Sequence, residues 1–70
     1  MTNLKRIRTA AGLSQSQLAE LSGMSLRSLQ HYEQGSRDIN KAQGQILLSL
    51  ARALNVTIED ILELTPEKEK

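Results

Sequence analysis

The sequence predicts a compact, all-α domain of five helices, and three observations lead to this prediction. Apolar residues make up 39% of the chain and are mainly Leu, Ile and Ala, with Tyr32 as the only aromatic residue. Aliphatic side chains of this kind suit helices better than strands. Gly12, Gly23, Gly35 and Pro66 divide the chain into short segments that open with capping residues. No segment shows the alternation or the β-branched enrichment of a strand.

The first helix is expected to begin after Thr2, which serves as its N-cap. Leu4, Ile7 and Ala11 share one face of this helix, because apolar residues at this spacing fall on one side. Gly12 then takes the left-handed position just past the helix end, where a residue without a Cβ is favoured.

Serine caps and glycine ends delimit the second and third helices. Ser14 and Gln17 have the spacing of a capping box, which predicts a helix over about residues 15–22. Ser25 predicts the cap of a third helix over about residues 26–34. The residues expected to be buried are Leu18, Ala19 and Leu21 in the second helix, and Leu29 and Tyr32 in the third.

The remaining chain predicts a polar loop at residues 35–40 and two more helices. Asn40 with Gln43 predicts the cap of a helix over about residues 41–54, and Gly44 predicts close packing in its first turns. Thr57 with Asp60 predicts the cap of a fifth helix over about residues 58–64. The apolar positions of these helices are Leu47, Leu50, Ala51 and Leu54, then Ile58, Ile61, Leu62 and Leu64. The domain is thus expected to span residues 1–64, and the charged residues 65–70 to form a disordered tail.

Length and composition limit the class of function. Seventy residues hold one small domain, in which a substrate pocket is improbable. The chain has no cysteine and a single histidine, which excludes disulfides and argues against a metal site. Its longest apolar run, residues 46–48, is far short of the roughly 20 residues of a membrane span, and no basic-then-apolar leader opens the chain. We therefore expect a soluble, intracellular binding module without metal or cofactor.

Charge is distributed unevenly although the net charge is only +1. Residues 1–41 carry six basic and three acidic side chains, a balance of +3, whereas residues 42–70 carry three and five, a balance of −2. Residues 1–41 are the candidate for contact with an anionic partner, and residues 42–70 for a surface that stays away from that partner. Charge alone leaves open that the imbalance arose by chance.

Residues 12–35 carry the main functional signal. They predict two helices of about eight residues joined by a turn at Gly23, the helix-turn-helix plan in which the second helix enters a DNA major groove. Any corner of two helices would give this spacing, and the residues make it specific. The segment RTAAGLSQSQLA at residues 8–19 resembles the opening of the lambda Cro/repressor-like (Xre-like) helix-turn-helix family. The resemblance continues through YEQGSR at 32–37, LLSLARAL at 47–54 and VTIEDIL at 56–62, and it covers residues 4–64.

The resemblance implies a five-helix, lambda-repressor-like domain that binds double-stranded DNA, as in prokaryotic and phage transcriptional regulators and repressors. The base contacts that it implies are Leu26, Arg27 and His31. The backbone contacts that it implies are Gln15, Ser25, Ser28, Gln34, Arg37 and Lys41. Gln15, with its side chain outward, would meet a phosphate at a helix N-terminus, where backbone N–H groups favour an anion. Relatives also pair the positions of Arg8 and Glu33, which implies a structural ion pair.

Several of these residues have a second interpretation. Leu26 departs from relatives that carry a hydrogen-bonding side chain such as glutamine. It can contact only an apolar group such as a thymine methyl, or it lies on the surface half-covered by its neighbours, so no base preference is carried over. Arg27 can read guanine or lie on a solvated face, and His31 can contact DNA or simply occupy the surface. Tyr32 is expected in the core rather than at a ligand.

Ser14, Ser25 and His31 could be drawn as a hydrolase fragment, but no acid, oxyanion loop or pocket accompanies them, and we expect no enzyme. Three functions remain open. The first is a homodimeric regulator on a palindromic operator in the cytoplasm and nucleoid, the second is an antitoxin-like partner of a toxin that binds DNA for autoregulation, and the third is a protein-binding module without DNA binding. The candidates for a weak dimer interface are Leu48, off the inward stripe of its helix, and Ile58, at the exposed start of the fifth helix. The operator sequence and the switching mechanism lie beyond the sequence.

Overall fold

The structure, a computed structural model, describes residues 2–63. The helices follow in the order α1 (Asn3–Ala10), α2 (Gln15–Ser22), α3 (Leu26–Gln34), the 3-10 helix η1 (Ile39–Lys41), α4 (Gly44–Leu54) and α5 (Ile58–Ile61). No strand occurs within residues 2–63, so the predicted all-α fold of five α-helices is confirmed. The longest helix there, α4, has 11 residues, and no helix in this range is long and apolar enough to cross a membrane. The tail predicted for residues 65–70 lies outside the described residues.

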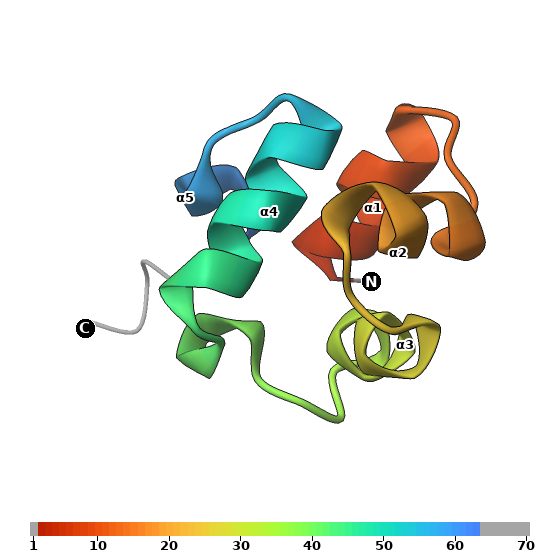
Figure 1. The fold of residues 1–70 in the computed structure, drawn as a ribbon. Helices are drawn as coiled ribbons and strands as arrows, with labels where there is room; N and C mark the ends of the chain where they lie inside the picture. The colour runs from red at the N-terminus through yellow and green to blue at the C-terminus, as the bar shows by residue number, and fades with distance from the viewer. Residues whose placement is uncertain (1, 64–70) are drawn as a thin grey trace.

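The helices are arranged so that α3 lies at one end of the molecule (Figure 1). The second helix, α2, packs against both α3 and α4, while α1 contacts α3 and α5. The segment from α3 to α4 runs along the same end, beside α3 (Figure 1). One side of α3 is therefore covered by α1 and α2, and the opposite side faces away from the domain.

The core is aliphatic, and each α-helix contributes one side chain that is fully closed to solvent. These five residues are Leu4, Leu18, Leu29, Leu50 and Ile61, each 0% exposed. Burying a side chain of this size contributes roughly 1.5–3 kcal/mol relative to leaving it exposed. Tyr32 is also buried, as the sequence predicts, and it is the core's only aromatic ring. The apolar residues at helical spacing therefore form the core against which α3 packs, through Leu29 and Tyr32.

The predicted caps of four helices are confirmed. The hydroxyls of Thr2, Ser14, Ser25 and Thr57 each accept a hydrogen bond from a backbone N–H three residues later. Ser14 and Thr57 belong to complete capping boxes. The chain leaves α2 at Gly23, with φ +75°, a left-handed conformation that costs side chains with a Cβ about 1–2 kcal/mol. The glycine thus permits the tight turn between α2 and α3.

The fourth and fifth helices are both shorter than predicted, and Asn40 explains much of the difference. Its amide nitrogen donates to the Glu63 carbonyl oxygen at 2.9 Å, and its Oδ1 accepts from the Glu63 N–H at 2.8 Å. The prediction that Asn40 caps α4 is therefore wrong. The N-cap is Gln43, without a side-chain bond, and α5 gives way to extended backbone at Leu62. The expected helical position of Leu64 lies outside the described residues.

Three predictions about packing are also wrong. Leu21 is 62% exposed, because it lies about 110° around α2 from the mean direction of Leu18 and Ala19. Ile39, predicted in a polar loop, is buried in the core as part of η1. Gly44 has open space where a Cβ would stand, so no close packing explains it.

Candidate nucleic-acid interface

The N-terminal half of α3 presents two of the predicted base-contacting residues to solvent. Leu26 is 39% exposed, and Arg27 is also exposed. Ser25 fixes the start of the helix, since its Oγ accepts a hydrogen bond from the Ser28 N–H at 3.1 Å. Ser28 is half-buried on the next turn. Leu26 and Arg27 are therefore exposed at a helix start that Ser25 caps.

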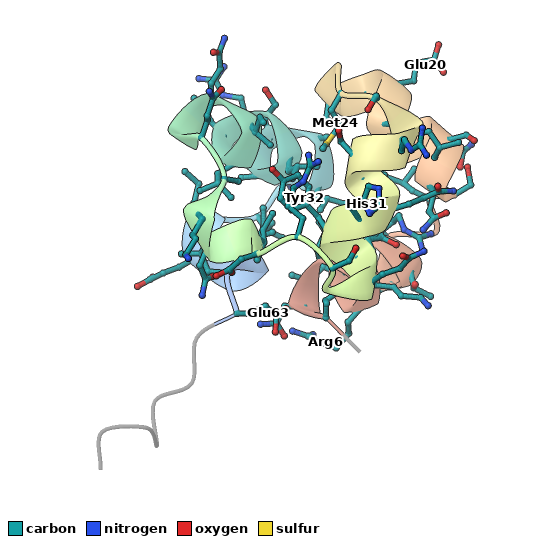
Figure 2. The ribbon with its side chains drawn as sticks, turned by 90° about the horizontal axis from the view of Figure 1, so that it is seen from below. Arg6, Glu20, Met24, His31, Tyr32 and Glu63 are labelled. Carbon is teal, nitrogen blue, oxygen red and sulfur yellow. The ribbon has the colours of Figure 1, made fainter. Side chains whose placement is uncertain are left out.

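His31 lies one turn beyond Arg27 and is half-buried. Figure 2 views the end of the molecule that carries α3 and shows the His31 ring on the near side of this helix. Its Nδ1 is 3.0 Å from Ser36 Oγ, in the loop that follows α3. Gln34, also predicted to contact DNA, is exposed at the last position of the helix. The predicted contacts at positions 27, 31 and 34 follow helical spacing along one side of α3.

Two exposed cations lie in the segment that follows α3. Arg37 lies in the loop after the helix, and its guanidinium carbon is 5.6 Å from the centroid of the Tyr32 ring, a cation–π arrangement. Lys41 is exposed in η1. Neither forms an ion pair with another residue of the range 2–63. Asp38 lies between them, so residues 35–41 carry a net charge of +1.

The side chain of Gln15 does not point outward as predicted. Its Nε2 donates to Glu33 Oε1 at 2.9 Å, and its Oε1 accepts from Gln30 Nε2 at 3.4 Å. Glu33 in turn accepts from Arg8, with Nε–Oε2 at 2.6 Å and Nη2–Oε1 at 3.0 Å. Arg8 also donates from Nη1 to the Leu13 carbonyl at 2.7 Å. The start of α2 is thus linked to α1 and α3 by side-chain hydrogen bonds.

The comparisons with known proteins bear directly on this arrangement. Residues 4–61, which hold all five α-helices except Asn3, match the family model described as helix-turn-helix. The chain belongs to the Cro/C1-type (Xre-like) helix-turn-helix family. No curated protein matches the chain. Membership in this family makes the chain a DNA-binding domain of the helix-turn-helix type, with α2 and α3 as its motif.

The residues that a hydrolase would need are used differently in this helix-turn-helix domain. Ser14 and Ser25 cap helices, and His31 contacts Ser36 rather than either of them. A pocket of about 260 Å³ lies between the α2–α3 turn and α4. Its lining residues, none of which titrates, are Ser22, Gly23, Met24, Gln45, Ile46 and Ser49. Within residues 2–63, no three His, Asp or Glu side chains come together as a metal site would require.

The two dimer candidates differ in their surroundings. Leu48 is 42% exposed on α4, off the buried stripe of that helix. Ile58 is half-buried, because it packs against the core where α5 begins, and so it is less exposed than the sequence suggests.

Sequence reasoning missed two polar residues at the interface. Gln30 bonds to Gln15, and its position four residues after Leu26 could have placed it on the same side of α3. Ser36 bonds to His31 across a left-handed turn at Gly35, and no periodic pattern indicates such a contact.

Proposed function

We propose that this chain regulates transcription by binding a specific sequence in double-stranded DNA, with α3 in the major groove. The observation that carries the proposal is the exposed side of α3, with Leu26 and Arg27 at its start and the cations Arg37 and Lys41 on the segment beside it. A major groove admits an α-helix and offers a distinct pattern of donors, acceptors and methyl groups for each base pair. Arginine reads guanine O6 and N7, while leucine contacts a thymine methyl.

His31, on the same side of α3, is the third proposed base contact, and the other predicted contacts are assigned to the DNA backbone. We propose that Ser25, Ser28 and Gln34 meet phosphate or sugar oxygens, and that Arg37 and Lys41 each neutralise a phosphate. Phosphate contacts fix the register of the domain on DNA without reading its sequence. Gln15 is proposed to contribute through its helix N-terminus, since its side-chain amide is bonded to Glu33 and Gln30.

We further propose that the domain forms a weak homodimer through α4 and α5 and binds a palindromic operator. One recognition helix reads one half-site, and a two-fold dimer reads two half-sites about 34 Å apart. The exposure of Leu48 supports this role for α4. Acidic Glu59 and Asp60, both exposed on α5, would keep that end away from phosphates. Such a protein acts where the DNA is, in the cytoplasm of a prokaryotic cell and at its nucleoid.

Selection of bound DNA from a random-sequence duplex pool tests the proposal. The purified chain is expected to enrich one sequence, whose logo shows two related half-sites. The Arg27→Ala variant is expected to lose preference at one base pair of each half-site, by a factor that corresponds to about 1–3 kcal/mol. No enrichment by the folded wild-type chain would overturn sequence-specific binding, and an unchanged logo for Arg27→Ala would remove Arg27 from the base contacts.

A further inference from the structure

The contact between His31 and Ser36 bears on which ring nitrogen of the histidine carries a proton. Ser36 Oγ is 3.0 Å from His31 Nδ1 and 3.2 Å from the carbonyl oxygen of the same histidine. A hydroxyl group has one proton to donate, and a carbonyl oxygen can only accept. Both contacts are attractive in one arrangement only: Ser36 donates to the carbonyl and accepts from an Nδ1–H group. In the neutral ring, Nε2 then carries no proton and is a hydrogen-bond acceptor.

The main chain holds Ser36 in place for this contact. After α3 ends at Gly35, with φ +85°, the chain turns back, and the Arg37 N–H donates to the His31 carbonyl at 3.2 Å. The Arg37 side chain is held in turn over the Tyr32 ring. The residues on both sides of Ser36 are thus fixed by the helix end, so the hydroxyl meets Nδ1 without depending on a long flexible side chain.

The other ring nitrogen of His31 is open to the surroundings. No residue of the range 2–63 forms a hydrogen bond with Nε2, and no buried side-chain nitrogen or oxygen in this range lacks a partner. Nε2 is therefore exposed to solvent, on the side of α3 that faces the viewer in Figure 2.

We infer that Ser36 holds His31 in the Nδ1–H form, so that Nε2 reads a base as a hydrogen-bond acceptor. The base-reading step rests on the proposed function of α3. In the major groove, adenine N6 and cytosine N4 are donors, whereas guanine presents N7 and O6 and thymine presents O4, all acceptors. Neutral His31 therefore selects an amino group, from adenine or cytosine, and disfavours an edge that offers only acceptors. Ser36 is a positioning residue that acts on DNA through the histidine.

The first test reads the tautomer directly. His31 is the only histidine of the chain, so its ring signals in a long-range ¹H–¹⁵N spectrum are unambiguous. The spectrum is recorded at a pH where the ring is neutral, so that only one of its two nitrogens carries a proton. The wild-type chain and Ser36→Thr, which keeps the hydroxyl, are expected to show a protonated Nδ1 and an unprotonated Nε2. Ser36→Ala is expected to shift the ring toward the Nε2–H form.

The matched control is Ser49→Ala on α4. It removes a comparable hydroxyl-to-carbonyl bond, from Ser49 Oγ to the Gln45 carbonyl at 2.9 Å, without touching His31. It is expected to leave the tautomer unchanged. A wild-type ring protonated at Nε2 would overturn the inference without any variant. An unchanged tautomer in folded Ser36→Ala would remove Ser36 as the group that holds the ring.

The second test reads the base preference. Selection with His31→Ala identifies the base pair that depends on the histidine, and the wild-type chain is expected to bind the natural pair more tightly than a pair whose adenine or cytosine is replaced by an analogue without the amino group. Ser36→Ala is expected to weaken this preference by roughly 3- to 10-fold, the scale of one hydrogen bond. Equal wild-type binding with and without the amino group would overturn the acceptor role. Absence of any DNA binding would overturn the proposed function and the base-reading step with it, while the spectra decide the tautomer separately.

Discussion

The guanidinium of Arg8 and the carboxylate of Glu33 form a two-pronged ion pair that is nearly closed to solvent. The side chains are 12% and 1% exposed, and the contacts are 2.6 Å for Nε–Oε2 and 3.0 Å for Nη2–Oε1. The pair connects α1 to the last turn of α3, and Gln15 adds a bond from α2. Three helices thus meet at one buried carboxylate, which sets the position of α3 relative to the first two helices.

Removal of one partner of this pair is expected to destabilise the fold strongly. Arg8→Met leaves the Glu33 carboxylate buried without its counter-charge, which costs about 3–5 kcal/mol. The double variant Arg8→Met/Glu33→Gln is expected to lose less than the sum of the two single losses, because it leaves no uncompensated charge. Urea unfolding of the wild type, both single variants and the double variant measures this coupling.

Arg6→Met is the control for loss of a positive charge on the same helix. Arg6 is exposed and bonds only to Asn3 among the described residues, so its loss should cost under about 1 kcal/mol. Small and additive losses for Arg8 and Glu33 would show that the ion pair does not hold α1 against α3.

The same substitution is expected to act in opposite directions at two glycines. Gly23 has φ +75°, where an alanine costs about 1–2 kcal/mol, although no atom lies within 4 Å of the added Cβ. Gly44 has an ordinary φ at the first position of α4, again with open space, so alanine there should stabilise the fold by about 0.4–1 kcal/mol. Thermal unfolding of Gly23→Ala and Gly44→Ala measures the sign of the stability change for each variant. Destabilisation by Gly44→Ala would contradict an ordinary φ at Gly44 with open space around the added Cβ.

The parts of the fold that the sequence predicts are those fixed by neighbouring residues. The caps at Ser14, Ser25 and Thr57, and the turn at Gly23, depend on contacts over three or four residues. Their patterns are therefore visible in the sequence, and they are enough to place α2 and α3. The predicted end of the fifth helix is wrong because Asn40, 23 residues before Glu63, forms hydrogen bonds with the backbone of Glu63.

In the candidate site too, the sequence predicts the features that depend on local spacing and misses those that depend on contacts between elements. The exposure of Leu26 and Arg27 agrees with their register in α3, which periodicity supplies. The bonds of Gln15 to Glu33 and of His31 to Ser36 were not predicted, since each depends on how two elements meet in space. Contacts within the protein therefore partly determine which donors and acceptors remain free to bind DNA, and sequence spacing does not predict these contacts.

A cation at the edge of the interface should affect DNA binding through salt. Lys41→Ala is expected to weaken binding to all sequences about equally and to reduce the slope of log K against log salt concentration by about 1. Arg52→Gln, on α4 outside the predicted interface, serves as the control and should leave the slope unchanged. Equal slopes for the wild type and Lys41→Ala would place Lys41 away from the phosphates.

Gln15→Ala should behave differently from Lys41→Ala because Gln15 is uncharged and is bonded inside the protein. We expect little change in DNA binding or in its salt slope, because the proposed contribution of Gln15 comes from the backbone of the helix N-terminus, together with a loss of roughly 0.5–1.5 kcal/mol in folding stability as its bond to Glu33 disappears. Salt titrations of binding and urea unfolding of the same preparation separate the two effects. Unaltered stability would mean that the amide does not support the buried carboxylate.

Self-association is best tested at Leu48 rather than at Ile58. Leu48 is 42% exposed, so Leu48→Glu places a charge on the surface of α4 with little effect on the core. Ile58 packs against the core, and Ile58→Glu would combine loss of a contact between chains with destabilisation of each chain.

Sedimentation over a concentration series is expected to show a weak wild-type dimer, strengthened by palindromic DNA, and a monomeric Leu48→Glu variant. Leu21→Glu, at an exposed leucine on α2, is the matched control and should still dimerise. A wild-type chain that stays monomeric and binds one half-site as tightly as two would end the dimer hypothesis.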